Sequence, residues 1–270
     1  VSQPPVLMYH HISEDVATDM VISPARFEAH MAALKEHGWN SVTIRQLIEF
    51  GEQGTPLPDH PVLITFDDGY LSNYELAYPI LEKYGMQATI FVIGVSVGKD
   101  VYKDTGNAMT PHFSYEQAAE MVQSGLISVQ SHTYDMHQWA PFETGEAVRE
   151  TILPLEGETE AAYVEALTAD FARSRQELEA ATGEAVDVLA YPSGAYSTLT
   201  QVVDSIVPGQ AYRLTVKAKK TSTYNAYVRA VINGDTEIDL FNTSVSFEWT
   251  EYTALLPDVQ DSVITIKIYS

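Results

Sequence analysis

The sequence predicts an α/β domain followed by an antiparallel β domain, and two observations carry this prediction. Over residues 1–196, short β-rich runs alternate with longer helical patterns, as expected for a parallel α/β sheet or barrel. Over residues 197–270 no helical stripe is found, and alternating strands are separated by turn signals such as Asn233-Gly234. We therefore place one domain at 1–196 and a β-sandwich at 197–270.

The first region contains strand and helix signals in regular succession. The run at 61–66 is almost continuously apolar, which is typical of a parallel strand covered on both faces. Ser23 and Pro24 have the residue types of a helix N-cap and first helical position, and Gly38 ends that helix. The predicted strands are 6–9, 40–43, 61–66, 88–93, 127–130 and 186–191, and the predicted helices are 24–37, 44–50, 74–84, 114–124 and 158–182.

The second region contains strand signals only. Most of its strands alternate apolar and polar residues, which is typical of sheets with one buried face. The predicted strands are 212–218, 224–232, 237–241, 244–247, 252–256 and 263–269.

Composition excludes several classes of function. The chain has 15 Lys and Arg against 37 Asp and Glu, a formal net charge of -22, which disfavours nucleic acid and anionic lipid as partners. No apolar run approaches the ~20 residues of a membrane span. The chain has no Cys, so a metal site would have to use His, Asp or Glu.

Two adjacent carboxylates, Asp67 and Asp68, directly follow the predicted strand at 61–66 and precede Gly69. Active sites of parallel α/β folds are built at the carboxyl ends of strands. Adjacent residues that leave a strand point to different sides, so one carboxylate can bind a metal while the other stays free as a base. A simple Asp-Asp-Gly turn is the alternative interpretation.

A second motif, Ser131 to His137, follows the predicted strand at 127–130. His132 and His137 are five residues apart, so a loop can bring them together whereas one helix face cannot. Two imidazoles and one carboxylate form a three-ligand site with room for water, as in catalytic zinc centres. Taken alone, the His pair would be surface or core residues; its position at a second strand end favours a shared site.

Two further segments lie at predicted strand ends. The turn from Tyr191 to Tyr196 either presents backbone N–H groups and Tyr196 to a substrate or is a plain loop. His10 ends the first strand and faces the same region, with a structural histidine as the alternative.

Together these motifs resemble the polysaccharide deacetylases, the NodB-homology group of carbohydrate esterases. The His spacing and the opening Tyr-His are most similar to the branch that acts on poly-N-acetylglucosamine of biofilms. The matching pieces are Tyr9-His10, Thr65-Phe66-Asp67-Asp68-Gly69-Tyr70, Ala88-Thr89-Ile90-Phe91-Val92, Ser131-His132-Thr133 with His137, and Tyr191-Pro192-Ser193-Gly194.

The resemblance implies an irregular (β/α) barrel and a set of site roles. It implies that Asp67 is the general base and that Asp68, His132 and His137 hold one divalent metal, with zinc favoured and cobalt, nickel or iron as alternatives. The sequence offers no clear general acid beyond His10. The substrate groove would be lined by Tyr70, Tyr191, Pro192, Ser193, Gly194 and Tyr196.

The chain departs from the family pattern after Tyr196, where further β/α units are expected and strands of the second domain begin instead. Either the barrel is shortened or a segment is missing. Residues 201–269 resemble the later strands of a carbohydrate-binding module.

The sequence therefore predicts metal-dependent hydrolysis of N-acetyl groups on a GlcNAc-containing polysaccharide by a secreted or cell-surface bacterial protein. The alternatives are an O-acetyl xylan esterase and a non-catalytic glycan-binding protein with an incomplete site.

Overall fold

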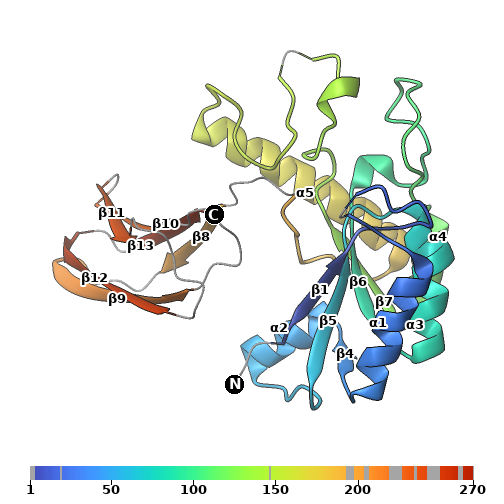
Figure 1. Ribbon diagram of the computed structural model, residues 1–270. Coiled ribbons are helices and arrows are strands. Elements are labelled where there is room, and N and C mark those ends of the chain that lie inside the picture. Colours follow the sequence, from blue (N-terminus) through green and yellow to red (C-terminus); the bar gives the residue numbers. More distant parts are fainter. Residues whose placement is uncertain are drawn as a thin grey trace. The chain divides into compact units, whose positions relative to one another are not determined.

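The structure is a computed structural model that divides into two compact units, residues 1–192 and 193–270 (Figure 1). The residues that it describes are 4–18, 20–145, 147–192, 198–203, 207–218, 227–233, 236–241, 250–260 and 264–269. Among them no helix combines the length and apolar character needed to cross a membrane.

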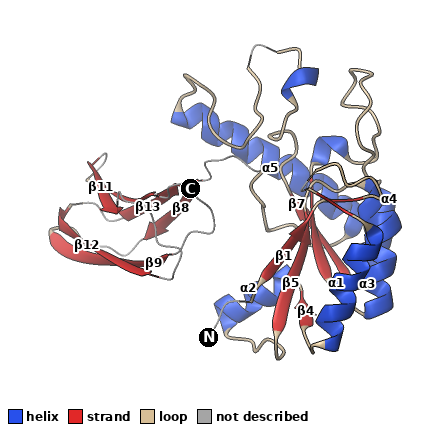
Figure 2. Cartoon of the chain, in the orientation of Figure 1, coloured by secondary structure: helices blue, strands red, loops and turns tan. Residues whose placement is uncertain are grey.

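The first unit is built on a five-stranded parallel sheet. The strands are β1 (Val6–Tyr9), β4 (Asn40–Val42), β5 (Pro61–Phe66), β6 (Ala88–Val92) and β7 (Ile127–Ser131). Their order is β1-β5-β6-β7, and β4 also pairs with β5. A short parallel pair, β2 (His11–Ile12) and β3 (Val21–Ile22), follows β1. Since the five strands run in one direction, their carboxyl ends all lie at the same end of the sheet, which is uppermost in Figure 2.

Helices with strong capping signals alternate with these strands. They are α1 (Pro24–Glu36), α2 (Ile44–Gln53), the π-helix η1 (Asn73–Ala77), α3 (Tyr78–Tyr84), the 3₁₀ turn η2 (Gly94–Ser96), α4 (Tyr115–Gln123), the 3₁₀ turn η3 (Ala140–Phe142) and α5 (Glu160–Thr182). Ser23 caps α1, and Thr43 and Ser114 form capping boxes at α2 and α4. The predicted helix at 74–84 begins with the π-helix η1, in which Asn73 is buried.

The core lies between the sheet and the helices that cover it. Phe27 of α1 packs edge to face against Phe66 of β5, and both are fully buried. Leu81 of α3 and Met121 of α4 extend the same core along the sheet. This packing fixes the strand ends from which the site residues emerge.

The predicted strand at 186–191 is wrong: its only pairing is an isolated parallel bridge between Ser131 and Leu189. Side chains replace the missing ladder partners. Gln130 Oε1 accepts from the backbone N–H groups of residues 187 and 188, and Glu179 Oε1 accepts from Val186 N–H. The backbone groups are satisfied without a strand, so no regular strand forms there.

The sheet is open at its β1 edge in the part of the chain that the structure describes. There β1 pairs with β5 alone, and Val6 and Met8 are 56% and 62% exposed. The barrel implied by the resemblance is therefore represented here by an α/β fold with an open parallel sheet.

The second unit contains two antiparallel sheets. β8 (Thr198–Val203), β10 (Tyr227–Ile232), β11 (Thr236–Phe241) and β13 (Ile264–Tyr269) form one sheet in the order β11-β10-β13-β8. β9 (Gln210–Ala218) pairs with β12 (Thr250–Val259). The strand β8 was not predicted, the predicted strand at 244–247 lies outside the described residues, and a β-sandwich remains a prediction.

Candidate active site

Asp67 and Asp68 leave the end of β5 in a tight, strained turn. Asp67 N–H donates to Tyr9 O at 3.0 Å, which ties this turn to the end of β1. Asp68 has φ 73° and is 8% exposed, an unusual conformation for a residue other than glycine. Gly69 follows with φ 83°, and a Cβ there would lie 3.1 Å from Val92 Cγ1. The backbone therefore leaves little freedom in where the Asp68 carboxylate points.

His132 and His137 come from the loop after β7. His132 N–H donates to Val92 O at 2.9 Å, which fixes the loop to the end of β6. Thr133 has φ 75°, so this loop too turns through the left-handed region. Nδ1 of His132 lies 3.0 Å from Ala190 O, and Nδ1 of His137 lies 2.8 Å from Glu150 O. Because a carbonyl only accepts, both Nδ1 atoms carry the proton and both Nε2 atoms have a free lone pair.

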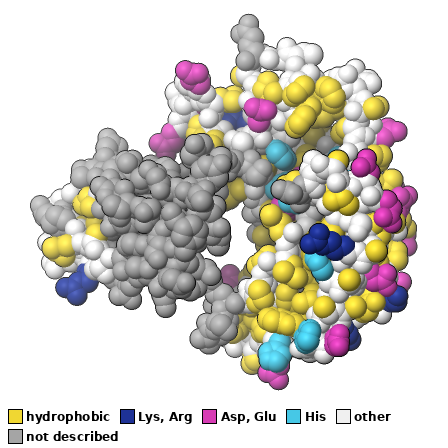
Figure 3. Space-filling model, viewed as in Figure 1, with side chains coloured by type: hydrophobic (Ala, Val, Ile, Leu, Met, Phe, Trp, Pro, Cys, Tyr) yellow, Lys and Arg dark blue, Asp and Glu magenta, His cyan; other side chains and the backbone are white. Residues whose placement is uncertain are grey.

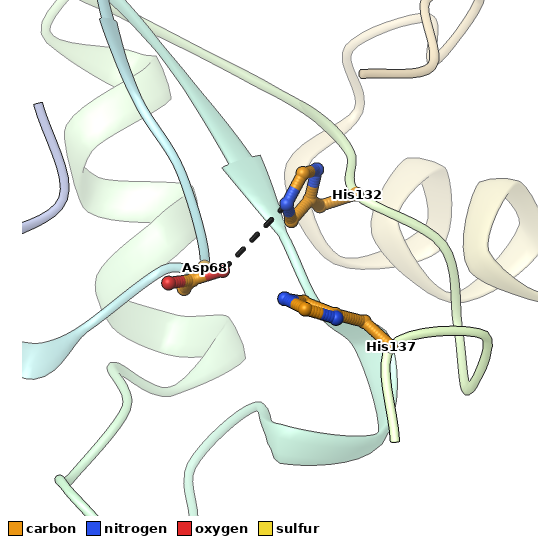
Figure 4. A group of neighbouring side chains, drawn as sticks. All are labelled: Asp68, His132 and His137. Carbon is orange, nitrogen blue, oxygen red and sulfur yellow. Dashed lines mark ion pairs between the residues drawn. The ribbon is translucent and has the colours of Figure 1, made fainter. Parts of the chain in front are cut away.

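The side chains of Asp68, His132 and His137 converge, as the sequence predicts (Figure 4). One ligand atom from each lies within 4.8 Å of the others, and Asp68 Oδ1 is 3.6 Å from His132 Nε2. Two ligands about 2.0–2.2 Å from one ion in tetrahedral geometry lie at about this separation. The donor set and its orientation therefore fit a divalent metal; its binding and its identity as zinc remain predictions.

The electrostatics of the cluster separate the two carboxylates. Burial raises the pKa of Asp67 to about 7, and the negative charge of Asp68 adds to the rise. Burial also lowers the pKa of His132 to about 4, so this imidazole is neutral at pH 7 and able to bind a metal. Asp67 is thus a carboxylate that can take up a proton near neutral pH.

His10 lies beside Asp67, with Nε2 3.7 Å from Asp67 Oδ2, and burial lowers its pKa. The fully buried Asn73 holds this segment, because its Nδ2 donates to His10 O at 2.8 Å. Asn73 was not predicted from the sequence. The only feature that could have pointed to it is its low helix propensity at the start of a helical pattern. The hydroxyl of Ser72 likewise accepts from Ile12 N–H at 3.1 Å.

Tyr70 lies between two histidine rings. Its ring centroid is 5.2 Å from that of His11 and 5.0 Å from that of His112. Burial raises the pKa of Tyr70, as do the charge of Asp68 and a side-chain hydrogen bond to it. Tyr70 therefore directs its hydroxyl to a predicted metal ligand.

A cavity of about 500 Å³ adjoins the cluster, within the ~300–1,000 Å³ typical of small-molecule sites. Asp68, Tyr70 and His137 lie on its metal side. The other side includes His112 and Trp139, which could not be predicted from the sequence because they belong to loops with no local pattern of their own.

The predicted turn at 191–196 is only partly described. Tyr191 is 47% exposed and Pro192 is buried, and neither lines the cavity. Ser193, Gly194 and Tyr196 lie outside the described residues, so their role in a substrate groove stays a prediction.

The chain is similar in sequence to known polysaccharide deacetylases. The model of the polysaccharide deacetylase family matches residues 54–206. The polysaccharide deacetylase-like protein YxkH of Bacillus subtilis is 43% identical over 131 residues. A poly-β-1,6-N-acetyl-D-glucosamine N-deacetylase of Staphylococcus aureus (strain MRSA252) is 32% identical over 130 residues. Each alignment covers 48% of this chain but only 42% and 43% of these relatives, so the chain spans less than half of their length.

The fold is similar to solved structures as well. The structure of IcaB from Ammonifex degensii matches with a TM-score of 0.56 and 31% sequence identity. The match covers 70% of this chain and 73% of that chain.

Proposed function

This chain belongs to the polysaccharide deacetylase family, and on that premise we propose that it hydrolyses N-acetyl groups on a GlcNAc-containing polysaccharide. The observation that carries the proposal is the convergence of Asp68, His132 and His137 beside the separate carboxylate of Asp67. The similarity to a poly-β-1,6-N-acetyl-D-glucosamine N-deacetylase supports this substrate class.

The chemistry starts with Asp67 as general base. When a water attacks the acetyl carbonyl carbon, the Asp67 carboxylate takes its proton. Tyr70 lies at the cavity wall, where its backbone N–H is the candidate donor to the oxygen that becomes negatively charged. The C–N bond then breaks, and the proton that Asp67 has taken can pass through His10, whose Nε2 lies 3.7 Å from Asp67 Oδ2, to the leaving amine.

The three ligands would hold one divalent cation, for which we propose zinc, with cobalt, nickel or iron as alternatives. Bound there, it would polarise the acetyl carbonyl and lower the pKa of a water toward ~7. The backbone carbonyls that accept from the two His Nδ1 atoms support this role, because they orient Nε2 toward the cluster.

The domain assignment follows from the same proposal. We assign catalysis to 1–196, an irregular (β/α) barrel that is open at β1 among the described residues, and a carbohydrate-binding role to 197–270 as an antiparallel β-sandwich. The two antiparallel sheets of the second unit support the sandwich. A polysaccharide substrate implies a secreted or cell-surface location, and the acidic net charge of -22 suits a polymer that becomes cationic as it is deacetylated.

Acetate release tests the proposal directly. The purified chain, loaded with Zn²⁺ or Co²⁺, should release acetate from a β-1,6-linked N-acetylglucosamine polymer, and a chelator should abolish the release. Acetylated xylan is the comparison substrate for the ester-hydrolysing alternative. Binding of the polymer with no acetate release at any metal loading would instead support a glycan-binding protein.

A further inference from the structure

The cavity beside the predicted metal site has a second wall that the proposed chemistry does not use. This wall is formed by the segment 101–112 and by the segment 138–142, which includes η3. Trp139 lines it and is 58% exposed, although large aromatic side chains are usually well buried. Figure 3 shows hydrophobic side chains on the surface of the first unit among the loops above the sheet.

The backbone of Trp139 is held in place although its ring is exposed. Trp139 N–H donates to Tyr102 Oη at 3.0 Å, and the Tyr102 hydroxyl also donates to Glu143. Tyr102 is 6% exposed and belongs to a hairpin in which its own N–H donates to Asn107 O at 2.8 Å. A large ring on a fixed backbone costs little conformational entropy when it contacts a ligand.

His112 supplies a polar group on the same wall. Its side chain packs against Tyr70, is 8% exposed and is one of the side chains that line the cavity. The imidazole is therefore within reach of a ligand in the cavity and can exchange a hydrogen bond with it.

We propose that this wall is a carbohydrate subsite, in which Trp139 stacks on the sugar unit next to the one that is deacetylated and His112 hydrogen-bonds to that unit. A pyranose ring presents C–H groups on its face and hydroxyl groups at its rim. An exposed aromatic ring matches the face, and the imidazole of His112, which lines the same cavity, matches a hydroxyl. The inference rests on the proposed function, because it extends the same site from one sugar unit to two.

The test compares binding with catalysis. A β-1,6-linked N-acetylglucosamine pentasaccharide is titrated calorimetrically into the wild-type protein, Trp139→Ala, Trp139→Phe and His112→Phe, without added metal. Trp139→Ala should weaken binding roughly 10-fold, as expected for the loss of one aromatic contact. The affinity of Trp139→Phe should lie between those of the wild-type protein and Trp139→Ala. His112→Phe should also weaken binding, although a phenyl ring keeps the aromatic packing on Tyr70. Trp39→Phe is the control, since Trp39 lines a different cavity.

Acetate release then separates the two proposals. With metal added, Trp139→Ala should lower kcat/KM on the pentasaccharide about 10-fold more than on the monosaccharide N-acetylglucosamine. Equal losses on both, no loss on either, or no binding of the pentasaccharide by the wild-type protein would overturn the subsite. If the wild-type protein binds the pentasaccharide in a Trp139-dependent way and releases no acetate from it, the subsite stands and the proposed function fails.

Discussion

The two sides of the candidate site are constructed differently. On the metal side, the predicted ligands follow directly after β5 and β7, and backbone hydrogen bonds from Asp67 to Tyr9 and from His132 to Val92 tie them to neighbouring strands. On the other side, the cavity wall consists of two loops that side chains connect. Lys103 of the first loop pairs with Glu143, which directly follows the second loop, and at 2.8 Å with Asp135, which lies in the loop that carries the His ligands.

This difference predicts which changes are severe. A backbone tied into a parallel sheet moves little, so the metal side should tolerate few substitutions, and errors there should abolish the chemistry. The loop wall depends on exposed and half-buried polar contacts, which contribute little to stability. Changes in the wall should therefore alter substrate affinity more than metal binding.

The largest expected effect is that of Asp68→Gly. This change removes a predicted ligand but suits φ 73°, where glycine has no Cβ strain. Metal affinity should fall at least about 100-fold, beyond the ~10–100-fold typical of losing a supporting residue, and activity should be lost. In the metal-free protein the relief of strain is offset by the loss of the hydrogen bond from Tyr70, so its stability should stay within about 1 kcal/mol of the wild-type value.

Metal content by mass spectrometry and thermal unfolding with a chelator measure both effects of Asp68→Gly. His37→Gln is the matched control, because His37 is an exposed histidine at the end of α1 and should keep metal and activity. Full metal content in Asp68→Gly would refute the ligand assignment.

Asp67→Asn tests the neighbouring carboxylate. Only the base is removed, so activity should fall roughly 10²–10⁴-fold while metal content stays close to that of the wild-type protein. Parallel metal analysis and acetate assays distinguish this result from loss of the site. Asp59→Asn, at an exposed position outside the site, should behave like the wild-type protein. Near-full activity of Asp67→Asn would show that another group is the base.

The difference between the metal side and the loop wall also explains which site residues could be predicted from the sequence. The ligand residues follow apolar strand patterns, and a parallel sheet alone brings the ends of β5 and β7 to one edge. The positions of Asp68 and His132 were therefore predictable from local patterns. His112 and Trp139 were not, because they meet only when the two loops pack together.

The failed strand prediction at 186–191 has a related cause. Its apolar run reads as a strand, but the side chains of Gln130 and Glu179 accept from its N–H groups. Asn73 was missed because the hydrogen bond that gives it a role joins residues 63 positions apart. Such tertiary contacts between side chain and backbone leave no periodic signal in the sequence.

Gly94→Ala tests how tightly the metal side is packed. A Cβ on Gly94 would lie 2.5 Å from Tyr134 Cδ2 and 3.2 Å from Tyr134 Cα, within the loop that carries both His ligands. We expect a loss of about 1–3 kcal/mol in the free energy of unfolding, typical of overpacking, and weaker metal binding. Chemical denaturation measures the free energy of unfolding, and metal titration measures the metal affinity. Gly51→Ala in α2 has open space and should stabilise by about 0.5–1 kcal/mol. Unchanged stability and metal affinity in Gly94→Ala would mean that the loop adjusts freely.

The smallest expected effect is that of Lys103→Met, which tests the loop wall. The ammonium group pairs with both Asp135 and Glu143, so its removal leaves both carboxylates without this cation and lets the wall that carries Trp139 shift. An ion pair of this kind contributes about 0.5–1 kcal/mol, which corresponds to a roughly 2- to 5-fold increase in KM for a pentasaccharide substrate. Metal affinity should change little, because the loop that carries the His ligands stays held by the backbone N–H groups of Tyr134 and Asp135, which donate to Asp170. Raising the salt concentration should weaken the wild-type contact and bring its KM toward that of the variant. Lys35→Met, at an exposed position in the last turn of α1, is the matched control and should show the wild-type KM. If Lys103→Met lost its metal while keeping its KM, the two sides of the site would not be independent, and the division drawn from their construction would be wrong.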